Sequence, residues 1–200
     1  RELQVGGTET QVMTLARGLL SENIPVKVVV FYSGGMIEKE LADFGIEVVD
    51  LRKSSRWSVG RFLFHWIKLL RSYRPNVIYS FLTEANLVAI LAKLVVPKTK
   101  VIWGIRAATS DTNLRENDLF VRIGFEVARR LSGMPNKIIT NSQSSKNYHV
   151  SKGFQEDNIE VVFNGVDPSV FKSDRQNGKK LKAGLKLMSD SRVIGIVARL

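Results

Sequence analysis

Short apolar runs alternate with helical patterns along the chain, and this alternation limits the fold more than any other feature. VKVVVFY, at residues 26–32, is almost continuously apolar and rich in valine, which is typical of a strand buried on both faces of a parallel sheet. Further apolar runs lie at 45–51, 76–81, 100–105, 136–141 and 158–164. Residues with helical spacing lie between them. Repeated strand–helix–strand units predict an α/β fold with a doubly wound, mainly parallel sheet and helices on both faces.

The first predicted helix, at residues 8–22, lacks the strand that should precede it. Thr8 and Gln11 have the spacing of a capping box at its start. Only residues 1–7 stand before the helix, and they are too few for a turn and a strand. We therefore expect the first strand of the sheet, a central one, to be missing from this chain and to lie in a segment before residue 1.

The pattern changes after Phe171. Residues 172–191 are polar and basic, and a new apolar run, RVIGIVARL, occupies residues 192–200. We expect one domain over residues 1–171, a linker or the start of a second domain at 172–191, and the first strand of that second domain at 192–200.

Positive charge is concentrated in one quarter of the chain. The net charge is +11, and residues 51–100 contain ten Lys or Arg residues but a single Asp or Glu. Apolar residues form a stripe in the helix expected at 58–74, with Phe64 and Leu69 off the stripe. An ordinary sheet-covering helix explains the stripe. The alternative is attraction of segment 52–74 to anionic lipid headgroups, which is worth about 1 kcal/mol per basic residue.

Several chemistries lack the residues that they need. The chain has no cysteine, no DxD motif and no cluster with metal-ligand spacing, so neither a metal nor a cofactor is expected. His65 falls inside a predicted helix and His149 near a helix end, and neither is placed as a catalytic base. No apolar run is long enough for a membrane-spanning helix. No RNP-like or helix-turn-helix signature indicates a nucleic-acid partner.

The glycine pair Gly6-Gly7 stands directly before the first helix. Glycines let the backbone approach an oxyanion closely, and the N–H groups and dipole of a helix N-terminus favour negative charge. A tight turn without a ligand explains the same pair equally well.

Several longer motifs resemble retaining glycosyltransferases of family 4 (group 1), which have the GT-B fold. The motifs are NGVD followed by Phe171 after the strand at 158–164, GIVARL near the end of the chain, GGTETQVMTLARGLL at the start, and IITNSQSSK at 138–146. The resemblance covers essentially the whole chain. It implies a Rossmann-like, acceptor-binding N-terminal domain followed by the start of a donor-binding domain.

The resemblance also implies roles for particular residues. Gly6 and Gly7 would lie near the phosphates of a nucleotide-sugar, and Arg199 would contact the donor diphosphate. Arg106 stands where many members of the family have a histidine that faces the sugar. There it would bind a phosphate or stabilise the leaving group, and a structural ion pair is an equal alternative.

Three further residues, Glu9, Asn141 and Asn164, are expected at the same cleft. The activity that the resemblance implies is transfer of a hexosyl or N-acetylhexosaminyl group, with retention, from a nucleotide diphosphate sugar to a hydroxyl acceptor. The acceptor is free or lipid-linked, as in polysaccharide biosynthesis. Residues 1–200 are expected to be inactive alone.

The expected location is the cytoplasm, with peripheral attachment to the inner face of the membrane as the alternative to a free enzyme. Two other functions stay open. One is a nucleotide-sugar epimerase of similar fold, and the other is a basic module that binds membranes or nucleic acid.

Overall fold

A computed structural model describes residues 6–53, 59–106, 119–168, 172–188 and 191–194. The chain divides into two compact units, Arg1–Gly165 and Val166–Leu200. Each unit is described by itself below.

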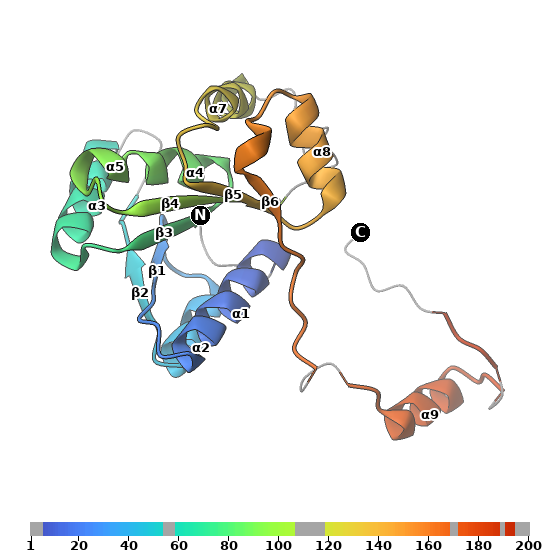
Figure 1. Ribbon diagram of the computed structural model, residues 1–200. Helices are drawn as coiled ribbons and strands as arrows, with labels where there is room; N and C mark the ends of the chain where they lie inside the picture. Colours follow the sequence, from blue (N-terminus) through green and yellow to red (C-terminus); the bar gives the residue numbers. More distant parts are fainter. Residues whose placement is uncertain (1–5, 54–58, 107–118, 169–171, 189–190, 195–200) are drawn as a thin grey trace. The chain divides into compact units, whose positions relative to one another are not determined.

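The first unit alternates strands and helices along the whole of its length (Figure 1). In chain order its elements are α1 (Gly7–Ser21), β1 (Lys27–Val30), α2 (Met36–Asp43), β2 (Glu47–Asp50), α3 (Val59–Tyr73), β3 (Val77–Phe81), α4 (Thr83–Ile90), α5 (Ala92–Val95), β4 (Lys100–Ile105), α7 (Leu119–Arg130), β5 (Lys137–Thr140), α8 (Gln143–Ser151), the short 3-10 helix η1 (Glu156–Asn158) and β6 (Ile159–Val161). The predicted α/β class is confirmed, and each strand predicted between residues 26 and 164 forms within its apolar run, although β6 already ends at Val161. The helical segment between β3 and β4 is divided at Leu91 into α4 and α5.

The strands form two sheets, and all of their pairings are parallel. One sheet pairs β1 with β2, and the other has the order β3-β4-β5-β6. In the larger sheet Phe81 is opposite Gly104, and Ile105 is opposite Thr140. The described part of the chain has no strand that joins β1 to β3, so the predicted sheet is split at this point.

Helices pack against both faces of the strands, as a doubly wound arrangement requires. On β1, Val28 and Val30 belong to a core cluster with α1 and α2, whereas Val29 and Phe31 pack against a second cluster built on α3. A third cluster surrounds β4, where Val101 and Trp103 are fully buried. These alternating contacts explain why the strands are apolar on both sides.

The N-terminus of α1 differs from the prediction. Gly6 is the N-cap, in extended conformation, and Gly7 is already the first helical residue. Thr10 donates hydrogen bonds to the Gly6 carbonyl oxygen from both its N–H and its hydroxyl, each 2.9 Å long. The prediction of Thr8 as the cap was wrong: the helix begins at Gly7, and Thr8 falls inside the first turn.

The second unit contains one helix in its described residues, α9 (Arg175–Gly184). The Asp174 side chain caps it by accepting a 2.9 Å hydrogen bond from the N–H of Asn177. None of the residues of α9 is buried. Most of the strand predicted at 192–200 lies outside the described residues.

In the described residues, no helix is long and apolar enough to cross a membrane.

His149, on α8, is one of the few titratable side chains in the core. It is 5% exposed and contacts the rings of Phe125, Tyr148 and Phe154, with centroid distances of 6.0, 5.2 and 5.0 Å. Its Nδ1 lies 2.8 Å from the Ser145 carbonyl oxygen. Burial lowers the pKa of His149 below its ordinary value of 6.5, and the bond to Ser145 opposes this only in part.

The lowered pKa predicts that the protein loses stability in mild acid. Below pH 6.5 the unfolded chain takes up a proton on His149 before the folded chain does, so the free energy of unfolding falls as the pH falls. With an ordinary pKa of 6.5 in the unfolded chain, the loss between pH 7 and pH 5.5 should be at most about 1 kcal/mol. Urea unfolding at several pH values measures it. His149→Gln should flatten the slope, and an unchanged slope in that variant would disprove the assignment.

Candidate functional site

The carboxyl ends of β3, β4, β5 and β6 lie along one edge of the larger sheet, because all of these strands are parallel (Figure 1). Arg106 directly follows β4, Asn141 follows β5, and Asn164 lies shortly after β6. In open parallel sheets, ligands bind at this edge. The candidate site is therefore built around these strand ends.

Arg106 is the centre of a small cluster at this edge. Its Nη1 donates a hydrogen bond to Oδ1 of Asn164. Its guanidinium carbon lies 5.2 Å from the centroid of the Phe81 ring, in a cation–π contact. Within the described residues, none of the ion pairs includes Arg106. The partners that the structure describes are neutral side chains, and a guanidinium at this edge of the sheet attracts anions.

Tyr79 is the third side chain that interacts with Arg106, after Asn164 and Phe81. Its ring lies 4.4 Å from that of Phe81, centroid to centroid. Burial raises the pKa of the Tyr79 hydroxyl above its ordinary value of 10.0, while the charge of Arg106 and a hydrogen bond to it act in the opposite direction. Tyr79 therefore remains a neutral phenol at physiological pH, and it adds no negative charge that would cancel the charge of Arg106.

Gly104 makes room for this arrangement. It is opposite Phe81 in the parallel register. A Cβ atom added at Gly104 would lie 2.8 Å from Cδ1 of Phe81 and 2.9 Å from the carbonyl oxygen of Ser80. Both distances are too short for carbon contacts, so only glycine lets the Phe81 ring lie over β4 beneath Arg106.

A buried polar network holds β3, β4 and α4 together just behind this cluster. Asn86 is 3% exposed. Its Oδ1 accepts a 2.7 Å hydrogen bond from the Ser80 hydroxyl, and its Nδ2 donates to the Gly104 carbonyl oxygen at 3.4 Å. Because a buried amide is costly when it lacks partners, this network fixes the strand ends that carry Phe81 and Arg106.

The backbone is strained at the same edge. Leu82, which links β3 to α4, has a φ angle of 75°. Residues other than glycine rarely adopt this backbone conformation. It costs about 1–3 kcal/mol, and such conformations cluster at functional sites.

The structure places the other predicted residues at different distances from Arg106. Nε2 of Gln11 donates a 3.2 Å hydrogen bond to the Gly165 carbonyl oxygen, so the first turns of α1, and with them Gly6 and Gly7, lie beside the segment after β6 that carries Asn164. In the described residues no hydrogen bond links Asn141 to Arg106. Arg199 lies outside the described residues.

Glu9 lies over the start of α1. A Cβ atom added at Gly6 would be 2.6 Å from Oε2 of Glu9, so the carboxylate lies beside the glycine that caps the helix. A negative charge in the first turn is favourable for the helix dipole. An incoming phosphate at Gly6 and Gly7 would therefore have to displace the Glu9 carboxylate.

Sequence reasoning missed Tyr79, Phe81 and Gln11. Tyr79 and Phe81 are separated by one residue near the end of the NVIYSF run, and this spacing puts two strand residues on one face. That pattern was available as a signal. Nothing in the sequence indicated that Gln11 contacts a residue more than a hundred positions later.

The cluster suits a phosphate-bearing ligand. A planar, charged donor lies at a strand end, and a glycine-capped helix N-terminus lies beside the same region. Among the described residues, no group of three or more His, Cys, Asp or Glu side chains is placed to hold a metal ion.

Comparison with family models gives a match over most of the chain. A family model described as Glycosyltransferase Family 4 matches residues 5–170. No curated protein sequence matches the chain.

Several solved structures share the fold. Crystal structures of HepE from Anabaena, in complex with UDP and glucose and with UDP-glucose, are each 18% identical with a TM-score of 0.71, and they cover 92% of this chain. A glycosyltransferase from Rickettsia africae is 16% identical with a TM-score of 0.62. The chain spans about half the length of these proteins, 47% to 49%.

Proposed function

Because the chain belongs to glycosyltransferase family 4, we propose that it is the acceptor-binding part of an enzyme that transfers a sugar from a nucleotide diphosphate sugar to a hydroxyl group. The observation that carries the proposal is the position of Arg106. It is a cation at the carboxyl edge of the sheet, and the contacts described for it are with an amide and two aromatic side chains. A diphosphate leaving group gains negative charge as the glycosidic bond breaks, and a fixed guanidinium stabilises that charge.

Retention at the anomeric carbon is part of the proposal. Gly6 and Gly7 would offer backbone N–H groups to a phosphate, and Asn164 would hold the Arg106 guanidinium in place through their hydrogen bond. Asn141 and Glu9 would contact the acceptor. Arg199 would add a second positive charge to the donor diphosphate.

The nucleotide-sugars bound by the structural relatives suggest which donor to test. HepE crystals contain UDP with glucose, or UDP-glucose. We propose that a uridine diphosphate hexose or N-acetylhexosamine is the donor here. The full-length enzyme should transfer glucose or N-acetylglucosamine from the UDP-sugar to a hydroxyl acceptor, and NMR of the product should show the anomeric configuration of the donor. Epimerisation of the UDP-sugar without transfer would overturn the proposal in favour of an epimerase.

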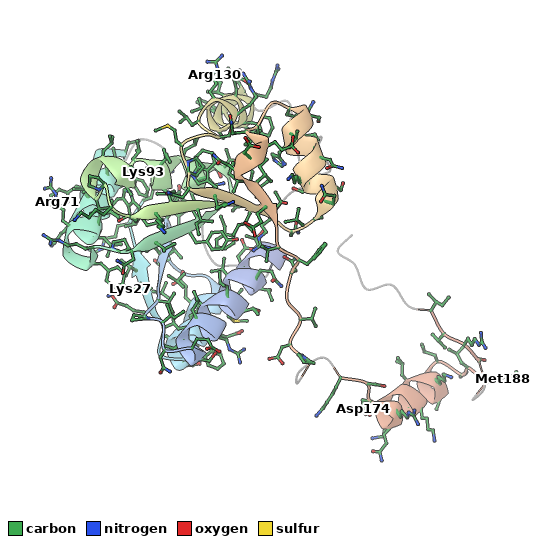
Figure 2. The ribbon with its side chains drawn as sticks, in the orientation of Figure 1. Lys27, Arg71, Lys93, Arg130, Asp174 and Met188 are labelled. Carbon is green, nitrogen blue, oxygen red and sulfur yellow. The ribbon has the colours of Figure 1, made fainter. Side chains whose placement is uncertain are left out.

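A peripheral attachment to anionic membranes, on the cytoplasmic side, is a second part of the proposal. Arg61, Phe64, Lys68 and Arg71 are exposed and follow one another at helical spacing along α3. Phe64 is 65% exposed, and Figure 2 shows Arg71 directed away from the sheet. Leu69, by contrast, packs against the core cluster of α3, so Phe64 is left as the apolar contact. This surface would bring the enzyme to a lipid-linked acceptor of polysaccharide synthesis.

Neutralising this surface should weaken vesicle binding. Arg61→Gln combined with Lys68→Gln removes two charges, and at about 1 kcal/mol each the affinity for vesicles rich in anionic lipid should fall by roughly 30-fold. Sedimentation with vesicles at low and physiological salt measures it. The matched control is Lys39→Gln with Arg130→Gln, two exposed residues on α2 and α7. An equal loss in the control would refute the surface, and preference for duplex DNA over vesicles would favour a nucleic-acid module.

A further inference from the structure

Lys53 lies just beyond the carboxyl end of β2, in the smaller sheet. The N–H of Leu51 donates a 2.9 Å hydrogen bond to the Val30 carbonyl oxygen. The N–H of Lys53 donates to the next carbonyl oxygen of the partner segment, that of Phe31, at 3.0 Å. The segment after β2 thus advances by two residues while its partner advances by one, as in a β-bulge, which re-aims a side chain at the end of a strand.

The extra residue in this segment is Arg52, and its backbone is strained. Its φ angle is 53°, and its N–H donates a 2.7 Å hydrogen bond to Oδ1 of Asp50. A left-handed conformation is costly for a residue other than glycine. The Asp50 side chain therefore stabilises the bend that positions Lys53.

Three aromatic rings lie around the ammonium group of Lys53. Nζ is 5.4 Å from the ring centroid of Phe31, 5.9 Å from that of Tyr32 and 5.7 Å from that of Phe62. The rings of Phe31 and Phe62 also contact each other edge to face, with centroids 4.9 Å apart. These four residues are called the Lys53 cluster below. Each ring attracts the cation through its π face.

The positive charge of Lys53 has no counter-ion among the described residues. The side chain is half-buried, and none of the ion pairs or hydrogen bonds seen there uses its ammonium group. Two other half-buried lysines differ in this respect, because Lys27 pairs with Glu47 and Lys146 pairs with Glu156. A partly desolvated ammonium with three unused donors gains more from an anion than a fully hydrated one does.

The Lys53 cluster suits a sugar that carries a negative charge. Phe31 and Tyr32 are half-buried, so part of each remains accessible. The apolar C–H face of a sugar ring packs on aromatic side chains, while a carboxylate or phosphate on the same sugar accepts hydrogen bonds from an ammonium group. The Tyr32 hydroxyl makes no hydrogen bond within the described part of the chain, so it is free to bond a sugar hydroxyl.

The Lys53 cluster and Arg106 both adjoin the start of α1. Lys53 contacts the ring of Phe31, and Arg106 contacts the ring of Phe81. The two phenylalanines line one cavity, together with residues of the first turn of α1. The region around the proposed donor site therefore contains a second cation, on a different strand from the first.

We infer that the Lys53 cluster binds an anionic group, a carboxylate or a phosphate, on the sugar that accepts the transferred glycosyl group. That the bound sugar is the acceptor rests on the proposed function. Binding of an anionic sugar at Lys53 does not, since it follows from the contacts and the uncompensated charge of this cluster.

Binding of small sugars to the full-length protein tests the site without any donor present. Methyl glucuronide and glucose 6-phosphate carry the two candidate anions, and methyl glucoside is the neutral counterpart. At least one charged sugar should bind about 10- to 100-fold more tightly than methyl glucoside in an NMR titration. The tighter of the two identifies the anion. Equal affinities for all three sugars would overturn the inference.

Variants locate the bound anion. Lys53→Gln should abolish the preference for the charged sugar and leave the affinity for a UDP-sugar unchanged, which also shows that the variant is folded. Lys53→Arg keeps the charge and should retain most of the preference. The matched control Lys39→Gln removes an exposed charge from α2 and should bind like the parent. A loss in Arg106→Gln but not in Lys53→Gln would place the anion at the donor site, against the inference.

Two results distinguish this inference from the proposed function. If charged sugars bind through Lys53 but no UDP-sugar gives a transfer product, the anion site stands and the proposed transfer fails. If transfer to a charged acceptor proceeds and Lys53→Gln leaves its KM unchanged, the proposed function stands and the role of Lys53 is wrong.

Discussion

Replacing Arg106 with glutamine in the full-length enzyme should lower kcat/KM for sugar transfer by about 100- to 1000-fold, the usual cost of removing a group that stabilises charge in the transition state. Glutamine retains a donor for Asn164 and fills part of the same space. The lost property is the positive charge beside the leaving diphosphate. The described partners of Arg106 are neutral, so no carboxylate seen in the structure is left without its counter-ion by the change.

Two further variants separate charge from structure at this position. Arg106→Lys keeps the charge but not the planar, two-pronged donor, so it should recover part of the activity. The control Arg130→Gln removes an exposed charge at the end of α7 (Figure 2). Arg130 pairs with Glu126, and the variant should leave kcat/KM unchanged. A fully active Arg106→Gln enzyme, or an equal loss in Arg130→Gln, would refute the role given to Arg106.

Gly104→Ala should destabilise the protein by about 2–3 kcal/mol, at the upper end of the cost of overpacking a core. The added methyl group would meet both the Phe81 ring and the Ser80 carbonyl oxygen at less than 3.0 Å. The ring can rotate, but the carbonyl oxygen belongs to β3 and moves only if the strand moves. Because Phe81 supports Arg106, the activity of the folded variant should fall as well.

The control for Gly104→Ala should raise the free energy of unfolding instead of lowering it. Gly18→Ala lies in the last turn of α1, where an added Cβ atom meets no other atom within 4 Å. It should stabilise the protein by up to about 1 kcal/mol, because alanine favours a helix over glycine. Urea unfolding of both variants measures the difference. A Gly104→Ala protein as stable as the parent would contradict the packing described at the strand end.

The order of strands and helices follows from the sequence because burial on two faces leaves a strong signal. VKVVVFY and KVIWGI are apolar almost throughout, and such runs between helical patterns leave little choice of fold class. The split between β1 and β3 could not be read in the same way. Both runs have the composition of inner strands, and composition does not reveal which neighbour is present.

Local conformation was predicted less well than topology. Thr8 has the chemistry of a helix cap, but α1 begins at Gly7, and the Gly6 carbonyl oxygen accepts the hydrogen bonds of Thr10. The division between α4 and α5 at Leu91 leaves no mark in an apolar segment whose helical spacing continues.

The candidate site was only partly visible in the sequence. Arg106 could be identified because it follows a strand and stands at a motif position of the family. Its partner Phe81 lies on β3 and its partner Asn164 lies after β6, so the two contacts depend on the register of the strands across the sheet. Register is set by packing over the whole sheet, so these partners could not be assigned from spacing alone.

The most direct measurement of the central claim is amide hydrogen exchange of the full-length enzyme with and without a UDP-sugar. The claim is that the donor phosphates bind at the carboxyl edge of the sheet, beside Arg106 and the start of α1. Exchange should therefore slow in the segments around Gly7, Arg106 and Gly165 and stay unchanged along α3 and α8. If the UDP-sugar binds and the exchange rates of all three segments stay unchanged, the claim is contradicted.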